Sequence, residues 1–178
     1  MKLNIGCGKR NFGDDWIHID GEKLNHIDNS DIYLESFETD SVDLIYSSHF
    51  LEYFDREDIM RLLIKWKNVL KKNGILRVAV PNFKACADLY SKGLYSLESF
   101  LGPLYGKMKM NQKFIYHKTV FDFKSIKNLL EEVGMKKIKI YDWRKTEHAT
   151  IDDHSQAYLP HMDKENGILI SLNVESMK

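Results

Sequence analysis

The sequence predicts a single α/β domain in which helices cover a mostly parallel sheet. Short apolar segments at residues 2–5, 16–19, 42–46 and 74–80 have the length and composition of buried strands. At residues 56–71, apolar side chains recur at steps of three and four residues, as on one face of a helix. Strands that alternate with helices are typical of parallel sheets. Because 178 residues suffice for one well-buried core, we expect one domain over residues 1–178.

The remaining elements each have a local signal. The 56–71 helix begins at Asp55 or Arg56 and ends before the turn residues Asn73 and Gly74. The stretch at 82–120 is too long for a simple connection, so we expect a helical insertion there, either a mobile lid or an ordinary insertion packed on the sheet. The expected helices are 56–71, 85–90 and 124–133, and the expected strands are 2–5, 16–19, 32–34, 42–46, 74–80, 137–141 and 168–174.

The first 45 residues contain strand signals but no convincing helical period. Parallel strands are normally joined by crossovers of a dozen or more residues, which usually include a helix. One face of the sheet is therefore expected to lack part of its helical cover. Exposed apolar area costs about 25 cal/mol per Å², so long side chains and loops, or a second subunit, must cover this face. We expect a homodimer.

The glycines that follow the first strand indicate a nucleoside-binding pocket. Gly6 and Gly8 let the backbone turn sharply and leave room for a ligand, and Asp20, at the end of the next strand, can accept hydrogen bonds from a ribose. A dinucleotide site has a third glycine, where this chain has Asn11, and a crossover helix before the acid. S-adenosylmethionine has a ribose and no phosphate, so its site needs neither the third glycine nor the crossover helix. An ordinary tight turn remains the alternative.

Composition excludes several other classes of function. Lys plus Arg and Asp plus Glu both number 26, so there is no basic field to attract nucleic acid or a membrane surface. Neither cysteine lies in a metal-ligand spacing, and no apolar run is long enough to span a bilayer. We expect a cytoplasmic protein with a small-molecule substrate, no structural metal and no membrane insertion.

These segments together resemble the class I S-adenosylmethionine-dependent methyltransferases. The matching pieces are residues 3–8, 16–20, 41–53 and 70–81. Residues 152–160 and 167–175 resemble, less specifically, small methyltransferases encoded with surface-polysaccharide genes. The resemblance implies a Rossmann-like sheet of seven strands, with the last strand antiparallel beside residues 74–80. It also implies S-adenosylmethionine as cofactor and a small acceptor, such as a sugar hydroxyl of a surface glycan.

The resemblance extends the set of expected cofactor residues beyond the glycine turn and Asp20. Asn4 stands where many relatives carry an acid, and Asp31 with Ile32 matches the place where the family often contacts adenine, with Asp28 as a competitor. Ser47 and Ser48 end the 42–46 strand beside the expected methyl group. The expected cofactor-binding residues are Asn4, Gly6, Cys7, Gly8, Asp20, Asp31, Ile32, Ser47 and Ser48.

A hydroxyl acceptor must lose a proton during methyl transfer, so the site needs a base. Imidazole titrates near neutral pH, which makes His49 and His117 the first candidates and His154 the third. A lone histidine is more often a surface or packing residue. Two other functions stay open, namely a non-catalytic S-adenosylmethionine-binding subunit and a nicotinamide-dependent oxidoreductase. The sequence favours the methyltransferase.

Overall fold

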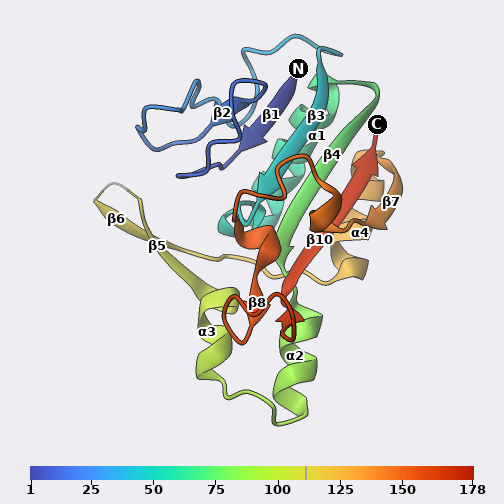
Figure 1. Cartoon of the computed structure of the whole chain (residues 1–178). Helices are drawn as coiled ribbons and strands as arrows, with labels where there is room; N and C mark the ends of the chain where they lie inside the picture. Colours follow the sequence, from blue (N-terminus) through green and yellow to red (C-terminus); the bar gives the residue numbers. More distant parts are fainter. Residues whose placement is uncertain (111) are drawn as a thin grey trace.

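The central feature of the fold is a mixed sheet whose strand order is β2-β1-β3-β4-β10-β7 (Figure 1). The computed structural model describes residues 1–110 and 112–178. The first four strands in this order run parallel, and β10 pairs antiparallel with both β4 and β7. The predicted position of the last strand is thus confirmed. The strands are β1 (Lys2–Ile5), β2 (Ile17–Ile19), β3 (Val42–Ser48), β4 (Leu70–Pro81), β7 (Lys136–Ile140) and β10 (Ser171–Met177).

The predicted strand at residues 32–34 does not form, so this sheet has six strands in the described part of the chain rather than seven. Leu34 has a positive φ of 57°, which does not fit an extended strand. The carbonyl of Ile32 accepts a hydrogen bond of 2.8 Å from Nε1 of Trp66, a residue on the helix after β3. Residues 32–34 therefore turn back over that helix instead of extending the sheet.

Two helices cover one face of the sheet. Helix α1 (Arg56–Val69) begins at Asp55, whose carboxylate accepts from the backbone N–H of Asp58. Helix α4 (Phe123–Val133) begins with a capping box of Asp122 and Ser125 and ends at Gly134, which has a φ of 88°. Beneath them lies the main aliphatic core, which includes Leu3, Ile5, Ile45, Leu62, Leu63, Trp66, Val78, Val80, Ile126, Leu130, Leu172 and Val174.

The other face is covered by irregular segments of the same chain (Figure 1). In residues 1–55, all of which the structure describes, the only helical segment is the 3₁₀ turn η1 (Leu51–Tyr53). The rings of Phe12, Trp16 and His148 pack around Tyr46 on the sheet, and the short helices η2 (Trp143–Lys145) and η3 (His154–Gln156) lie in the covering segment. Loops and long side chains thus provide cover for this face, and the homodimer stays a prediction.

The 82–120 insertion consists of two helices followed by a hairpin. Its first part is helical, as expected, and the hairpin was not expected. Helices α2 (Phe83–Ser91) and α3 (Glu98–Tyr105) enclose a small second core with Phe100 at its centre, beside the hairpin of β8 (Tyr158–Leu159) and β9 (Ile168–Leu169). The hairpin of β5 (Gly106–Met110) and β6 (Lys113–Tyr116) projects away from the helices (Figure 1). Met110, the last residue of β5, lies against the loop after β2, where a Cβ on Gly21 would be 2.6 Å from its Cε.

The helices of this fold are all too short or too polar to cross a bilayer, as far as the described residues extend.

Candidate functional site

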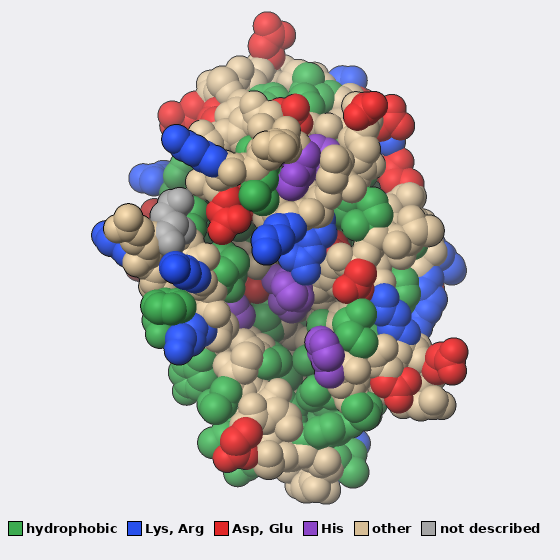
Figure 2. Space-filling model, turned by 60° about the vertical axis from the view of Figure 1, so that its left-hand side comes forward, with side chains coloured by type: hydrophobic (Ala, Val, Ile, Leu, Met, Phe, Trp, Pro, Cys, Tyr) green, Lys and Arg blue, Asp and Glu red, His purple; other side chains and the backbone are tan. Residues whose placement is uncertain are grey.

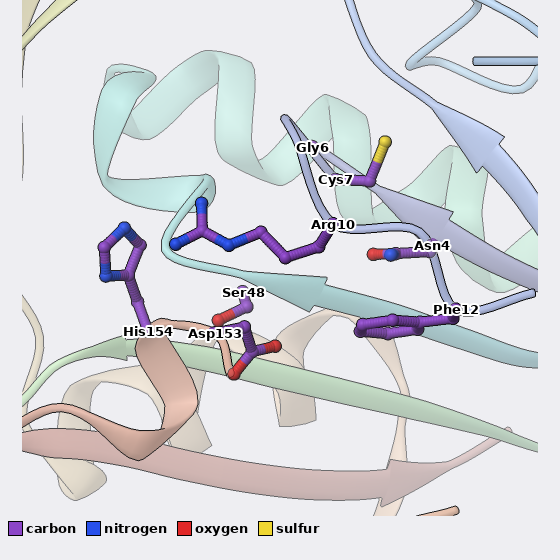
Figure 3. Close-up of a pocket in the computed structure, with 8 residues that line it drawn as sticks. All are labelled: Asn4, Gly6, Cys7, Arg10, Phe12, Ser48, Asp153 and His154. Carbon is purple, nitrogen blue, oxygen red and sulfur yellow. The ribbon is translucent and has the colours of Figure 1, made fainter. Parts of the chain in front are cut away.

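A small cavity opens at the carboxyl ends of β1 and β3, where ligands bind in open α/β sheets. Its volume is about 20 Å³. Three segments meet there, namely the end of β1 with the glycine turn, the end of β3, and the start of η3 (Figure 3). The lining residues are Asn4, Gly6, Cys7, Arg10, Phe12, Ser48, Asp153 and His154.

The glycine turn is held in place by close packing and by Asp20. Gly6 has a φ of 71°, and a Cβ there would lie 2.3 Å from Cδ2 of Phe50, so no other residue fits without rearrangement. The Asp20 carboxylate accepts hydrogen bonds from the backbone N–H of Gly8 at 2.8 Å and of Glu22 at 2.9 Å. Asp20 thus ties the turn after β1 to the end of β2.

The structure brings together only part of the predicted cofactor set. Asn4, Gly6, Cys7 and Ser48 line the cavity, and Gly8 and Asp20 belong to the adjoining turn. The remaining three predicted residues do not line it. Ser47 is buried on the opposite, helix-covered face, the Asp31 carboxylate accepts from the N–H and hydroxyl of Ser36, and Ile32 packs against the main core. An adenine contact for Asp31 and Ile32 stays a prediction.

Two buried polar atoms at the cavity have no hydrogen-bond partner within the described residues, namely Nδ2 of Asn4 and Oγ of Ser48. An unpaired buried donor or acceptor costs about 1–3 kcal/mol, so such groups are usually explained by a ligand or water. The residues present therefore fit a polar ligand at the ends of β1 and β3. The expected cofactor S-adenosylmethionine has polar groups of this kind on its methionine part.

Arg10 lies across this cavity and was not assigned by the sequence analysis. Its side chain extends from the glycine turn toward His154 (Figure 3), and its Nε makes a single long hydrogen bond of 3.5 Å to the carbonyl of Asp152. With Arg10 in this position the cavity has room for about one water molecule. A larger ligand requires Arg10 to move, and the weak contact allows that. The available signal was a basic residue two positions after Gly8.

The predicted bases lie beside this cavity in one buried cluster with Glu52. Nδ1 of His49 is 3.5 Å from Oε1 of Glu52, and Nε2 of His117 is 3.8 Å from the same oxygen. The side chains of His49 and His117 are 13% and 6% exposed, and Glu52 is fully buried. Glu52 was missed as a site residue, although its spacing of three from His49 at the start of a helical turn was a usable signal.

Burial shifts the titration of the whole cluster. It raises the pKa of Glu52 to about 8, because both carboxyl oxygens are inaccessible and unpaired. Burial, with His154, His117 and Arg10 nearby, lowers the pKa of His49 well below its usual value, and burial also lowers the pKa of His117. Both imidazoles are therefore neutral at physiological pH.

His154, the third predicted base, connects the cluster to the cavity. It lines the cavity, and its ring centroid is 5.2 Å from that of His49. Figure 2 shows histidine side chains gathered around a hollow in one face of the molecule, beside basic side chains. Within the described residues, no three His, Cys, Asp or Glu side chains are arranged to hold a metal ion.

Comparison with known proteins indicates the same class of enzyme as the geometry of the site. The family described as "Methyltransferase domain" matches residues 9–78, which include Asp20, β3 and α1. No curated protein matches the chain.

Solved structures match nearly the whole chain. A methyltransferase from Archaeoglobus fulgidus that depends on S-adenosylmethionine has a TM-score of 0.60 at 18% identity, over 99% of this chain and 85% of that one. A possible histamine N-methyltransferase from Thermotoga maritima has a TM-score of 0.61 at 13% identity, over 99% and 81%. The 1,6-didemethyltoxoflavin-N1-methyltransferase of Burkholderia thailandensis, bound to S-adenosylhomocysteine, has a TM-score of 0.56 at 10% identity, over 99% and 70%. Likeness at this level of identity establishes the fold.

The fold, with its glycine turn and acid at the ends of neighbouring strands, is that of the class I methyltransferases. Together with the family match over residues 9–78, it makes this chain an S-adenosylmethionine-dependent methyltransferase. S-adenosylmethionine is accordingly its methyl donor.

Proposed function

We propose that this enzyme methylates a hydroxyl group of a small acceptor, and that a sugar hydroxyl of a surface-polysaccharide precursor is the acceptor class. The observation that carries the proposal is the cluster of neutral imidazoles at the carboxyl end of β3, next to the cavity. A hydroxyl must lose its proton as the methyl group arrives, and a base positioned for this contributes about 10²–10⁴-fold. His49 is the proposed base.

The cofactor is held, in this proposal, by residues of the glycine turn and its neighbours. Asp20 takes the ribose hydroxyls, Asn4 and Ser48 take polar groups of the methionine part, and Arg10 swings aside to pair with its carboxylate. S-adenosylmethionine brings an activated methyl group. The protein has to align it with the acceptor oxygen, and alignment of this kind contributes several kcal/mol in well-oriented systems.

Support for a sugar acceptor comes from the segment that carries the narrower family resemblance. Residues 152–160 include Asp153 and His154, which line the cavity, and Ser171 of the 167–175 segment lies 3.1 Å from Nε2 of His49. The part of the chain that resembles polysaccharide-associated methyltransferases is thus next to the proposed base.

The test is a turnover assay in which mass spectrometry detects both S-adenosylhomocysteine and a product heavier by one methyl group. Nucleotide-linked sugars with free hydroxyls are compared with amine acceptors, because two of the similar structures are described as N-methyltransferases. Methylation of a sugar hydroxyl is the expected result. Methylation of amines alone would contradict the proposal, and no turnover with any acceptor would favour the non-catalytic subunit.

Two substitutions separate binding from catalysis. Asp20→Ala should weaken cofactor binding by about 1.5–3 kcal/mol, the range for hydrogen bonds to a charged group, as measured by calorimetry. His49→Ala should lower kcat by about 10²-fold or more while cofactor affinity changes little. His161→Ala is the matched control, since His161 is exposed and lies outside the cavity lining. Unchanged affinity in Asp20→Ala would remove Asp20 from the site, and equal losses of kcat and affinity in His49→Ala would make His49 a binding residue.

A further inference from the structure

The hydrogen bonds around the buried cluster determine which nitrogen of each histidine carries the proton. For His117, Nδ1 lies 3.1 Å from the carbonyl oxygen of Pro103. A carbonyl only accepts, so Nδ1 of His117 carries a hydrogen and donates it. In the neutral ring Nε2 is then bare, and this is the nitrogen that faces Oε1 of Glu52 at 3.8 Å.

The same reasoning applies to His49 through a longer chain of contacts. Nδ2 of Asn173 donates to the carbonyl of Ser155 at 2.9 Å, which fixes the orientation of the Asn173 amide. Its Oδ1 therefore accepts from the hydroxyl of Ser171, also at 2.9 Å. The Ser171 oxygen is left to accept from Nε2 of His49 at 3.1 Å, so Nε2 carries the hydrogen. Nδ1 of His49 is bare and faces Oε1 of Glu52 at 3.5 Å.

Two bare imidazole nitrogens thus converge on one oxygen of a fully buried carboxyl group. Neither oxygen of Glu52 has a hydrogen-bond donor among the described residues. An ionised carboxylate at this place would face two lone pairs and no solvent, whereas a protonated carboxyl group can donate to either nitrogen. The arrangement is that of a neutral carboxylic acid.

The other titratable and charged groups around the cluster do not alter this arrangement. The ring of His154, from η3, is 5.2 Å from that of His49, and the ring of Tyr53, from η1, is 4.7 Å from that of His117. Arg10, on the glycine turn, acts on His49 only as a nearby positive charge. Lys118, next to His117, pairs with Asp55 at 3.9 Å.

We propose that Glu52 is a positioning residue whose own proton decides whether His49 can act as the base. This inference rests on the proposed function of His49. While Glu52 is protonated, it donates to Nδ1 of His49, and Nε2 keeps its hydrogen. When the pair loses a proton to water, the Glu52 proton moves to Nδ1 and the hydrogen on Nε2 is released. The bare Nε2, which lies 3.1 Å from the Ser171 oxygen, then belongs to a ring that the Glu52 carboxylate stabilises.

The methyl-transfer step then balances. The acceptor O–H bond breaks and its proton goes to Nε2 of His49. The acceptor oxygen forms the new bond to the methyl carbon, and the electron pair of the broken S–C bond stays on sulfur as S-adenosylhomocysteine. The imidazolium formed is stabilised by the ionised Glu52 at 3.5 Å. Because burial raises the pKa of Glu52 to about 8, kcat should rise with pH through the mildly alkaline range.

Nitrogen-15 NMR of the histidine rings tests the proposal without acceptor or cofactor. From pH 6 to 10, His49 of the native protein should change from the Nε2–H to the Nδ1–H tautomer, with a midpoint near 8. In Glu52→Gln the amide N–H₂ donates to Nδ1 at every pH, so His49 should stay Nε2–H. The kcat of this variant should be about 10²-fold lower with KM little changed, and without the alkaline rise. Glu52→Asp should keep the tautomer change with a shifted midpoint.

Any of three results would overturn the proposal. The first is that His49 is already the Nδ1–H tautomer at pH 6, and the second is that the Glu52 carboxyl, followed by carbon-13 NMR, titrates at the pH of an ordinary glutamate. The third is a divalent metal ion bound stoichiometrically in place of the proton. The carbon-13 measurement needs only the native protein, so it decides the matter even if Glu52→Gln fails to fold. If the tautomer change occurs but no hydroxyl acceptor is methylated, the proposed function fails and the assignment of the Glu52 proton stands. A normal alkaline rise of kcat in Glu52→Gln would contradict the positioning role alone.

Discussion

The two faces of the sheet are built from different kinds of residue. Under α1 and α4, neighbouring strands present Leu3, Ile45, Leu76 and similar side chains in register. On the face covered by irregular segments, the corresponding row reads Asn4, Tyr46, Arg77 and Glu175. The first face needs only apolar area for its cover. The second needs a hydrogen-bond partner for almost every side chain.

The polar face shows how a binding site is accommodated in a buried layer. In its middle Arg77 is bonded to Glu175 at 2.7 Å and the hydroxyl of Tyr46 is bonded to Asp153, whereas the Tyr141 hydroxyl and Nδ1 of His148 have no partner among the described residues. Asn4 and Ser48 also have unpaired atoms, and these two residues line the cavity. The helix-covered face therefore contributes buried apolar area, while the polar face includes the residues that line the site.

The largest expected effect is on the helix-covered face. Trp66 is fully buried, so Trp66→Ala should destabilise the protein by about 3–5 kcal/mol through the cavity that it leaves. Urea unfolding measures the loss. Ile64→Ala on the same helix is the control, since Ile64 is 44% exposed and its replacement should cost about 0.5 kcal/mol or less. Similar losses of unfolding free energy in both variants would contradict the burial of Trp66 in the main core.

The next effect belongs to the polar face and depends on pH. Burial lowers the pKa of His148 from 6.5 to about 4. Between these two pH values the histidine is protonated in the unfolded chain and neutral in the folded protein, so protonation favours unfolding. Stability is therefore lost as pH falls from 6.5 to 4, by about 3 kcal/mol at 1.36 kcal/mol per pKa unit. His148→Phe should remove this loss and keep the stacking on Phe12. The loss is measured by unfolding both variants at pH 7 and pH 4.5, with His161→Gln, at an exposed position, as the control. If His148→Phe were as sensitive to acid as the native protein, the burial of a neutral His148 would be contradicted.

The smallest effect tests a single hydrogen bond of the polar face. Tyr46→Phe removes the hydroxyl that donates to Asp153, and the expected cost is about 1–2 kcal/mol, because Asp153 keeps its bonds from Ser155. Thermal unfolding measures it against Tyr33→Phe, whose hydroxyl only accepts from Arg61 at the surface. Equal costs in the two variants would mean that the polar face contributes no more than a surface contact.

The helix-covered face could be predicted from the sequence because its signals are local. The helix at 56–71 and its end before Gly74 follow from a three-to-four-residue period, and Gly6, Gly8 and Asp20 follow from strand ends that meet at one edge. The polar face could not be predicted in this way. His148 and Asp153 lie in a segment without period, and their burial depends on contacts with Phe12 and Tyr46 more than 100 residues away.

The same dependence on contacts between distant residues explains where the prediction from sequence is wrong or incomplete. Residues 32–34 have the composition of a strand, but the indole of Trp66 takes the carbonyl of Ile32 that a neighbouring strand would have used. Arg10 has only its place two residues after Gly8, which a surface cation can also have. Glu52 has only its spacing of three from His49, and the contact with His117 is added by the fold.

The two ends of the insertion lie side by side. Asn82 and Phe121 form a bridge, and the backbone N–H of Phe83 donates to the carbonyl of Phe121 at 2.9 Å. Because insertions whose ends are adjacent are well tolerated by a scaffold, this segment can be exchanged for one of another length without changing the path of the chain on either side. A longer or shorter segment would lose the contact of His117 with Glu52, whereas β4 and α4 on either side would keep their places.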